Sequence, residues 1–452
     1  MSLGNHKMMN TMKIHFIAIG GSIMHNLAIA LSRNGHTVTG SDDVIYGISH
    51  DKLSAEGLLP AEFGWYPESI TEDIDLIILG MHAKIDNPEL LKAQELGIKI
   101  QSFPAFIASH SQEKRRIIVA GSHGKTTTTS MLMHILKAAK QDYDYLVGAQ
   151  LADFDLMVQL SDAPLIVIEG DEYLSSAIDR RPKFVHYNPH ITIITGIAWD
   201  HANVFPTADD YKLQFDTLLN ALEDGASVYY DANDPELVDL VNQYAGRLSV
   251  TGYLGLDGVG SSVTKDGSEY TMNIFGQHNR KNMHAALLVA RELGIEMEKG
   301  LQSMQSFQGA AMRQQVIKET SPRIYRDFGH APSKVRATIE AVVENHRDAR
   351  IGVLVELHSY SSMLADFIPQ YAGVFDHVEA AAVCVDAHAF KIKKMPVLKS
   401  EEIQSAFASA DCKVIFDKDD LQQLIEDWQQ YDVLLLLSSG NLMGVEVVQL
   451  PN

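Results

Sequence analysis

A short stretch near residue 120 constrains the fold of this chain more than any other. Residues 117–127 comprise four apolar residues, a turn bounded by Gly121 and Gly124, and the tripeptide Gly-Lys-Thr that ends at Thr126. The pattern predicts a buried strand, a tight turn and the start of a helix. In such a turn, backbone N–H groups converge on a phosphate, lysine adds positive charge and threonine can ligate Mg²⁺. The spacing is G-x-x-G-K-T, shorter than the usual GxxxxGK[ST], and ATP-dependent chemistry is the leading interpretation.

Composition limits the setting in which this chemistry occurs. The chain has 452 residues and a net charge of −21, so we predict several domains and no nucleic-acid partner. Cys384 and Cys412 do not form a CxxC pattern, which argues against a disulfide framework or a cysteine zinc site. No run of about 20 apolar residues occurs. We therefore predict a cytoplasmic protein without a membrane segment; whether residues 1–12 are native stays open.

Apolar, strand-like runs alternate with segments of helical period along the whole chain, which is typical of parallel α/β sheets. Three blocks result, at residues 13–112, 113–311 and 312–452. Each contains apolar strands separated by helical segments, so we predict three α/β domains. The segment 102–116 becomes polar toward its end, and we interpret it as the linker between the first two domains.

The first block opens with a nucleotide-binding βαβ pattern. A strand from Lys13 leads to a turn at Gly20-Gly21, a helix extends through Arg33, and a second strand ends at Asp42. An acidic residue about 20 positions after the turn is typical of dinucleotide sites. Ala18 replaces the first glycine of that fingerprint, so the pattern indicates a nucleotide without identifying it.

Polar groups follow two buried strands of the second block. Glu169 comes directly after strand 165–168, and His201 follows strand 191–195 after a short connection. Ligands of α/β proteins bind beyond the carboxyl ends of such strands. A carboxylate and a neutral imidazole can complete a Mg²⁺ site when the ion also holds nucleotide phosphates.

Later segments add a helix start and three strands. Asn279 and Asn282 lie three residues apart, so their amides can face a base or ribose from one side of a helix. The segments 323–327, 351–356 and 433–437 have the apolar composition of buried parallel strands. The third block is therefore a further α/β domain.

The order of five motifs resembles that of the Mur ligases, amide-forming enzymes of cell-wall synthesis. The motifs are Gly121-Ser-His-Gly-Lys-Thr-Thr-Thr128, Ile168-Glu-Gly-Asp-Glu172, Asp200-His201, Gly276-Gln-His-Asn-Arg-Lys-Asn282 and Asp327-Phe-Gly-His-Ala-Pro332. The resemblance covers the chain from Lys13 onward. It implies an N-terminal Rossmann-like UDP-binding domain, a central P-loop ATPase-like domain and a C-terminal Rossmann-like domain for an incoming peptide. Stretches 41–46, 178–189 and 200–205 resemble the murein peptide ligases of the family more than the ligases that add free L-alanine.

The resemblance also implies a reaction. A recycled tripeptide, L-alanyl-γ-D-glutamyl-meso-diaminopimelate, is joined to UDP-N-acetylmuramate through an acyl phosphate, with ATP and Mg²⁺ required. The implied catalytic residues are Lys125, which we expect to be exposed in its loop, Glu169, His201 and His330. The implied metal ligands are Thr126, Glu169 and His201. The implied ATP-binding residues are Gly121, Ser122, His123, Gly124, Lys125, Thr126, Thr127, His278, Asn279, Asn282, Arg313 and Asp327. The implied sugar-nucleotide and peptide contacts are Gly20, Gly21, Ser22, Ser41, Asp42, His82, Lys84, His358 and Tyr360.

Several positions depart from the family pattern. Met312 stands where the first of two arginines is expected, and Ala331 replaces a second histidine. The family segment Glu-Pro-Arg-Ser-Asn-Thr reads Glu-Leu-His-Ser-Tyr-Ser at 356–361. The change removes an arginine, which could donate two hydrogen bonds to a substrate carboxylate. A lysine suited to carbamylation is also not evident, since Lys212 is nearest and Leu213 occupies the expected place.

Other functions fit parts of the sequence. A ligase for free L-alanine or a folylpolyglutamate-type synthetase would share the ATP site. A catalytically silent nucleotide-binding regulator would account for the substitutions at Ala18, Met312 and Ala331. A mechanical ATPase has no supporting repeat or coiled coil. The oligomeric state is open.

Overall fold

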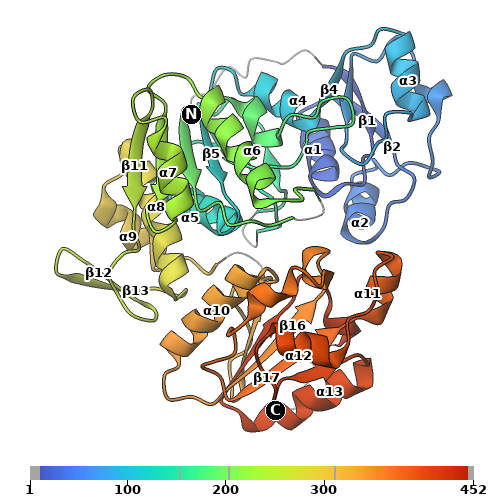
Figure 1. Cartoon of the computed structure of the whole chain (residues 1–452). Helices are drawn as coiled ribbons and strands as arrows, with labels where there is room; N and C mark the ends of the chain where they lie inside the picture. The colour runs from blue at the N-terminus through green and yellow to red at the C-terminus, as the bar shows by residue number, and fades with distance from the viewer. Residues whose placement is uncertain (1–10, 152–153, 202–203, 310–311, 446–452) are drawn as a thin grey trace. The chain divides into compact units, whose positions relative to one another are not determined.

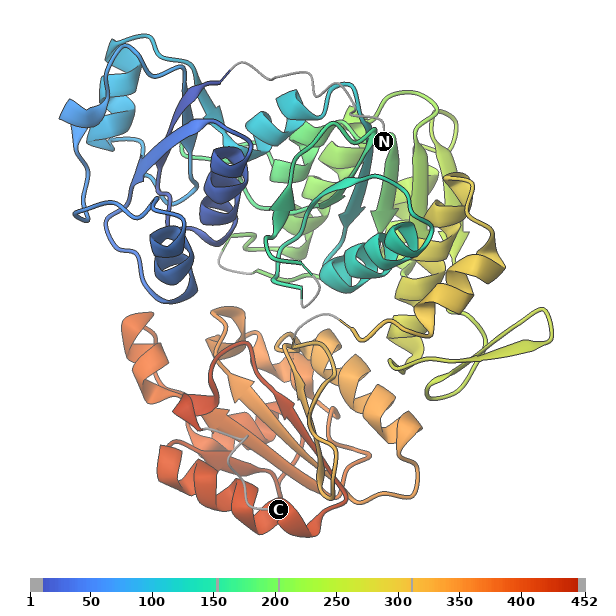
Figure 2. The ribbon, with the colours of Figure 1, turned by 180° about the vertical axis from the view of Figure 1, so that it is seen from behind.

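The structure, a computed structural model, describes residues 11–151, 154–201, 204–309 and 312–445 (Figures 1 and 2). These residues form two compact units. The first contains residues 11–120, 142–191 and 221–226, and the second contains the remainder. Residues 1–10, and residues 202 and 203 of the stretch that resembles the peptide ligases, lie outside the described part. The domain boundaries at 112 and 311 stay predictions.

The first unit begins with a parallel four-stranded sheet in the order β2-β1-β3-β4. Its elements are β1 (Lys13–Ile17), α1 (Ser22–Arg33), β2 (Thr37–Ser41), α2 (Gly47–Ala55), the 3-10 helix η1 (Pro67–Ser69), β3 (Leu76–Leu79), α3 (Pro88–Glu95), β4 (Ile100–Ser102) and α4 (Phe103–His110). Leu90 and Ala93 of α3 pack with Ile17, Ile77 and Leu79 on one face. The predicted βαβ unit is confirmed as β1, α1 and β2.

The same unit contains four further strands. They are β5 (Arg115–Ala120), β6 (Asp144–Leu146), β7 (Val158–Gln159) and β8 (Leu165–Glu169), followed by the 3-10 helix η2 (Lys183–Tyr187). β8 pairs in parallel with both β5 and β6, while β7 runs antiparallel to β6. The apolar run before the glycine turn is therefore a buried strand, as predicted.

The prediction of a linker at 102–116 is wrong. Ser102 caps α4, whose Phe106 and Ile107 are buried. Lys114 is only 7% exposed, and its Nζ lies 3.0 Å from Asp144 Oδ2 in a buried ion pair. Two of the charged residues that make the stretch polar, Lys114 and Arg116, are thus buried and hydrogen-bonded inside the fold rather than solvated.

This buried pair gives a stability prediction. Asp144→Ala leaves the Lys114 ammonium buried without its counter-charge, which typically costs about 3–5 kcal/mol. We expect the free energy of unfolding, measured in urea, to fall by that order. The exposed Asp73→Ala change, which removes the surface pair with Lys13, is the control and should leave the free energy of unfolding nearly unchanged. Equal losses in the two variants would contradict the role assigned to the buried pair.

The second unit begins directly after β5. Its first elements are α5 (Lys125–Ala138), β9 (Ile191–Ile194), α6 (Ala208–Ala221), β10 (Ser227–Asp231), α7 (Pro235–Asn242), β11 (Ser249–Tyr253), β12 (Ser262–Lys265), β13 (Ser268–Thr271), α8 (Gln277–Glu292) and α9 (Met297–Met304). β10 and β11 are parallel, and β12 and β13 form an antiparallel hairpin. Helix α5 packs against α8, which brings the turn after β5 to the start of α8.

The remaining elements form a six-stranded sheet in the order β14-β15-β19-β16-β17-β18. They are β14 (Gln315–Lys318), β15 (Arg323–Asp327), α10 (Pro332–Asn345), β16 (Ile351–Leu357), η3 (Ser361–Met363), η4 (Ile368–Tyr371), β17 (Ala380–Val385), α11 (Ala387–Ile392), α12 (Ser400–Ala406), β18 (Lys413–Ile415), α13 (Lys418–Asp427), η5 (Trp428–Gln430), β19 (Val433–Leu437) and η6 (Leu442–Gly444). Helices α10 and α12 cover one face and α13 covers the other. This explains the continuous apolar runs of the predicted strands. Within the described residues, no helix has the length and apolarity needed to span a membrane.

Candidate nucleotide-binding site

The turn between β5 and α5 has room only for glycine at two positions. Gly121 has φ +130°, and a Cβ built there would lie 2.3 Å from Thr195 Oγ1. Gly124 has φ +74°, and its added Cβ would lie 2.5 Å from Asn282 Oδ1. Helix α5 begins at the next residue, Lys125, so its N-terminus faces the turn. Strand, turn and helix thus have the arrangement that binds phosphate in other proteins.

Lys125 lies over the turn that precedes it. Its Nζ donates a hydrogen bond to the Gly121 carbonyl oxygen at 2.6 Å, and its side chain is half-buried rather than exposed as predicted. Thr126 and Thr127 are buried in the first turn of α5. The ammonium group is therefore held at the loop before any ligand binds.

A cavity of about 250 Å³ adjoins this turn and is confined to the second unit. Eight of the twelve predicted ATP-binding residues line it: His123, Gly124, Thr127, His278, Asn279, Asn282, Arg313 and Asp327. The other four lie on the same turn and helix start. The fold therefore brings together groups that are more than 200 positions apart in the chain.

Hydrogen bonds inside the protein decide which atoms of the cavity wall can face a ligand. Asn279 Nδ2 donates to the Phe275 carbonyl oxygen and to Gln314 Oε1, both at 2.9 Å, which leaves its Oδ1 as an acceptor. The carboxylate of Asp327 accepts one backbone N–H on each oxygen, from Gln314 at 2.8 Å and Gly329 at 2.7 Å. Each of those oxygens has a second lone pair that can accept a ribose hydroxyl.

An ion pair between half-buried Lys334 and buried Asp200, which sequence reasoning missed, lies beside the cavity. Lys334 of α10 lines the cavity, and its Nζ lies 2.9 Å from Asp200 Oδ2. Burial by itself would raise the pKa of Asp200, but Lys334, then His201 and His330, outweigh it and lower that pKa below its usual range. The signal that could have found the pair is sequence position, since Asp200 directly precedes His201 and Lys334 lies in the first turn of α10, just after the Asp327 motif.

The two histidines near this pair are neutral at physiological pH. Burial, reinforced by Lys334, lowers the pKa of His330 to about 4 and that of His123 to about 3. His330 Nδ1 lies 2.9 Å from the Phe328 carbonyl oxygen, and His123 Nε2 contacts the Ser333 hydroxyl. His330 does not line the cavity. His201 has an unusual left-handed backbone, with φ +57°, and its N–H donates to Asp200 Oδ1.

Gln314 and Lys281 are further cavity residues that the sequence did not reveal. Gln314 connects Asn279 to Asp327 through the hydrogen bonds given above, and its Nε2 is buried with no partner among the described residues. Lys281 Nζ lies 2.8 Å from Asp231 Oδ2. Both contacts join segments distant in sequence, so no local pattern announces them.

The predicted substrate residues of the first unit lie in the turn after β1 and at the ends of β2 and β3. The Gly20 N–H donates to Asp42 Oδ2 at 2.8 Å, and burial raises the pKa of Asp42 to about 6. Ser41 donates its hydroxyl to buried Glu89. His82 and Lys84 are exposed after β3. Gly21 and Ser22 complete the turn, which therefore keeps its shape through buried hydrogen bonds.

The remaining predicted site residues lie elsewhere. Glu169 ends β8 in the first unit, is half-buried, and accepts the Gly148 N–H at 2.7 Å. His358 and Tyr360 follow β16 in the second unit and do not line the cavity. The His358 carbonyl oxygen accepts a hydrogen bond from Lys393, and Tyr360 is 39% exposed.

Comparison with known proteins identifies the family. Residues 13–115 match the catalytic domain of the Mur ligase family, and residues 119–290 match the Mur ligase middle domain. A Haemophilus influenzae protein named UDP-N-acetylmuramate–L-alanyl-γ-D-glutamyl-meso-2,6-diaminoheptanedioate ligase is 30% identical, over 96% of this chain and 97% of its own. The chain belongs to the Mur ligase family. Mur ligases are ATP-dependent enzymes of peptidoglycan synthesis that form C–N bonds.

Other relatives carry two different substrate names. A UDP-N-acetylmuramate–L-alanine ligase from Lactobacillus delbrueckii is 28% identical, over 97% of each chain. The crystal structure of a murein peptide ligase from Psychrobacter arcticus, with 24% identity and a TM-score of 0.65, covers 96% of this chain and 97% of its own. The likeness to that structure confirms the predicted α/β fold. The relatives leave the amino substrate open.

The neutral histidines predict how stability depends on pH. Unfolded histidine has a pKa near 6.5, so below that pH the unfolded chain binds protons that buried His330 does not. Neutral His330 therefore contributes its full stability above pH 6.5. The folded state loses this contribution as pH falls from about 6.5 toward 4. Between pH 7 and 4.5 we expect wild type to lose about 2–3 kcal/mol more unfolding free energy than His330→Gln.

Urea unfolding at both pH values measures this difference. His50→Gln, which changes a partly exposed histidine on α2, is the matched control and should track wild type. A His330→Gln protein with the same pH-dependent loss as wild type would show that His330 does not stay neutral in the fold.

Proposed function

We propose that this chain is the ligase that joins L-alanyl-γ-D-glutamyl-meso-diaminopimelate to UDP-N-acetylmuramate at the expense of ATP, in peptidoglycan recycling. The cavity that joins the turn after β5, the start of α8 and Asp327 carries the ATP-dependent part of this proposal. The name of the Haemophilus influenzae relative supports the tripeptide. Because both ATP and a UDP-sugar are cytoplasmic metabolites, we propose the cytoplasm as the location.

The chemistry follows from the weakness of a carboxylate as an acyl donor. The muramoyl carboxylate attacks the γ-phosphorus of ATP and ADP leaves, which gives an acyl phosphate. The peptide amine then attacks the acyl carbon, a proton is lost from nitrogen, and phosphate leaves. Lys125 and the backbone N–H groups at the start of α5 stabilise the charge on the transferring phosphoryl group. Asn279, Asn282 and Asp327 hold the adenosine.

Magnesium fits the donors that we assign to it. Among the described residues no three His, Cys, Asp or Glu side chains form a metal cluster. Mg²⁺ in phosphoryl-transfer sites commonly takes one or two carboxylates, with phosphates and water filling the other positions. Thr126, Glu169 and His201 would hold it, and it would neutralise charge between the γ-phosphate and the substrate carboxylate.

The two substrates use different parts of the chain in this proposal. The turn at Gly20–Ser22, with Ser41, Asp42, His82 and Lys84 near it, receives the UDP-muramoyl group. His358 and Tyr360 contact the peptide. Because His358 replaces an arginine, it offers a single N–H donor in place of a bidentate pair, so this contact recognises a carboxylate with a different geometry.

A second candidate is the addition of free L-alanine to the same UDP-sugar. The Lactobacillus delbrueckii relative favours it, since its identity to this chain is only two percentage points below that of the Haemophilus protein. A silent nucleotide-binding regulator would bind ATP without releasing phosphate. One assay therefore separates all three functions.

Phosphate release from ATP with UDP-N-acetylmuramate tests the substrate. We expect kcat/KM for the tripeptide to exceed that for free L-alanine by at least roughly tenfold, or about 1.4 kcal/mol of transition-state binding. Equal or better use of L-alanine would identify an L-alanine ligase. If neither the tripeptide nor L-alanine leads to phosphate release, the chain is a regulator or a ligase for a different substrate.

The lysine of the turn tests the ATP site. Lys125→Ala should lower kcat by about 10²–10³ while the protein stays folded, because the ammonium stabilises charge on the transferring phosphoryl group. Lys137→Ala, an exposed change in the last turn of the same helix, is the control. Turnover near wild type in Lys125→Ala would refute the assignment of the phosphate loop.

A further inference from the structure

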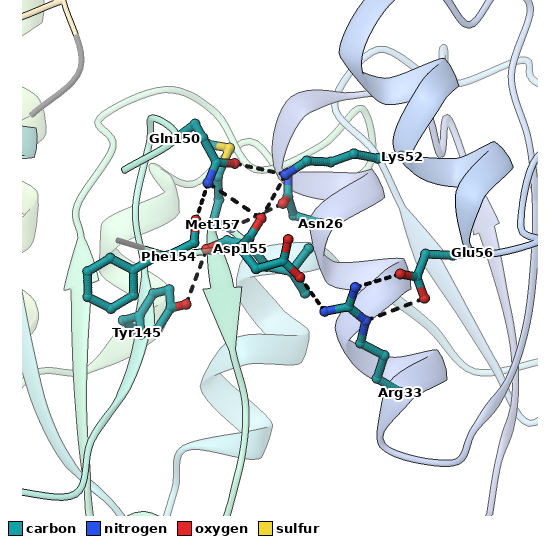
Figure 3. Close-up of polar contacts among 10 residues, drawn as sticks. Asn26, Arg33, Lys52, Glu56, Tyr145, Gln150, Phe154, Asp155 and Met157 are labelled. Atoms are coloured by element: carbon teal, nitrogen blue, oxygen red, sulfur yellow. Dashed lines mark hydrogen bonds and ion pairs between the residues drawn. The ribbon is translucent and has the colours of Figure 1, made fainter. Parts of the chain in front are cut away.

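Two cations, Arg33 of α1 and Lys52 of α2, form polar contacts with Gln150 and Asp155, which follow β6 in the chain (Figure 3). Lys52 Nζ of α2 donates to Gln150 Oε1 and to the Asp155 carbonyl oxygen, both at 2.8 Å. Arg33, at the end of α1, donates Nη1 to Asp155 Oδ2 and Nη2 to Glu56 Oε1, both at 2.5 Å. The hydrogen bond from Arg33 lowers the pKa of Asp155, so the ion pair persists at neutral pH. All of these residues belong to the first unit.

A buried amide links the same segment to the turn after β1. The Met157 N–H donates to Asn26 Oδ1 at 3.0 Å, and Asn26 Nδ2 donates to the Ser22 carbonyl oxygen at 2.8 Å. The Ser22 hydroxyl in turn lies 3.4 Å from Met157 Sδ. Asn26 is 1% exposed. The turn to which we assign the UDP group therefore contacts Met157 directly.

The other end of the segment contacts Glu169. The Gly148 N–H donates to Glu169 Oε2 at 2.7 Å, and a Cβ added at Gly148 would lie 2.7 Å from Oε1. A side chain at Gly148 would therefore displace the carboxylate. Gly148, Gln150, Asp155 and Met157, which we call the bridge residues, thus contact the sugar-nucleotide turn at one end and the proposed metal ligand at the other.

The exposure of the Arg33–Asp155 ion pair indicates what the pair does. The side chain of Arg33 is 46% exposed and that of Asp155 is 71% exposed. Ion pairs with this degree of exposure contribute little to the global stability of a protein. The two cations instead act locally, since they hold Gln150 and Asp155 against helices α1 and α2. A local positioning role fits this arrangement better than a stabilising one.

We propose that Arg33 and Lys52 are positioning residues, which hold the bridge residues so that the sugar-nucleotide turn and the Glu169 carboxylate keep a fixed separation. The role rests on the function proposed above for both groups. Transfer of a phosphoryl group to the muramoyl carboxylate requires that this carboxylate and the metal ligand lie at the correct distance from each other. Small displacements of reacting groups lower the rate strongly. The ATP cavity is lined by residues of the second unit alone, so its affinity should not depend on Arg33 or Lys52.

The double variant Arg33→Ala/Lys52→Ala tests the proposal in the full-length enzyme. We expect KM for UDP-N-acetylmuramate and the half-saturating Mg²⁺ concentration each to rise at least roughly fivefold, with KM for ATP within about twofold of wild type. The conservative variant Lys52→Arg, which keeps a donor and the charge, should stay close to wild type in all three quantities. Lys92→Ala, which removes the exposed pair with Glu95 on α3, is the matched control.

Hydrogen exchange gives a readout that does not need activity. In the double variant the amides of Gly148 and Met157 should exchange faster than in wild type, and the control should not change them. Unchanged exchange, or an unchanged requirement for both UDP-N-acetylmuramate and Mg²⁺ in an active enzyme, overturns the positioning role. A wild-type protein that releases no phosphate with UDP-N-acetylmuramate refutes the proposed function instead, while the exchange result still decides whether the cations hold the bridge residues.

Discussion

The crowding around the turn between β5 and α5 determines the geometry of the nucleotide site. At Gly121 and Gly124 the backbone takes positive φ, and neighbouring atoms of Thr195 and Asn282 lie where a Cβ would be. The strand therefore reaches the helix through a loop that only these glycines allow. The same close approach fixes Asn282, and with it the start of α8, against the loop. The turn to which we assign the phosphates and the helix start to which we assign the base and ribose are thereby held at a fixed distance from each other.

The charge around the turn between β5 and α5 also depends on residues outside the phosphate motif. Lys334 pairs with Asp200, and its positive charge adds to burial in lowering the pKa values of His123 and His330. The histidines therefore add no positive charge near the loop at neutral pH. The described cations of the cavity wall are Arg313, Lys281 and Lys334, and Asp231 and Asp200 partly offset the charges of the two lysines. Lys125 adds a further positive charge at the turn itself.

Sequence patterns predicted the parts of the molecule that depend on local order. Parallel strands buried on both faces, such as β16 and β19, are continuous apolar runs, and the glycine turn has a fixed spacing, so both were recognisable. Eight predicted ATP-binding residues line one cavity for the same reason, since each belongs to a short motif. Lys334, Gln314 and Lys281 were missed because their roles arise from contacts with residues far away in the sequence. Helix α4 was mistaken for a linker because the charges after it, on Lys114 and Arg116, are satisfied inside the fold rather than by water.

The segment after β16 shows why the amino substrate is harder to infer than the nucleotide. Glu356, which the family pattern retains, is fully buried and accepts N–H groups of Leu442 and Met443, so its presence reflects the fold of the loop after β19. His358 Nδ1 has no partner among the described residues, and Tyr360 is partly exposed. The retained residue is thus structural, while we assign ligand contact to the two changed ones. On that proposal, overall identity cannot separate a tripeptide ligase from an L-alanine ligase, because identity weights both kinds of residue equally.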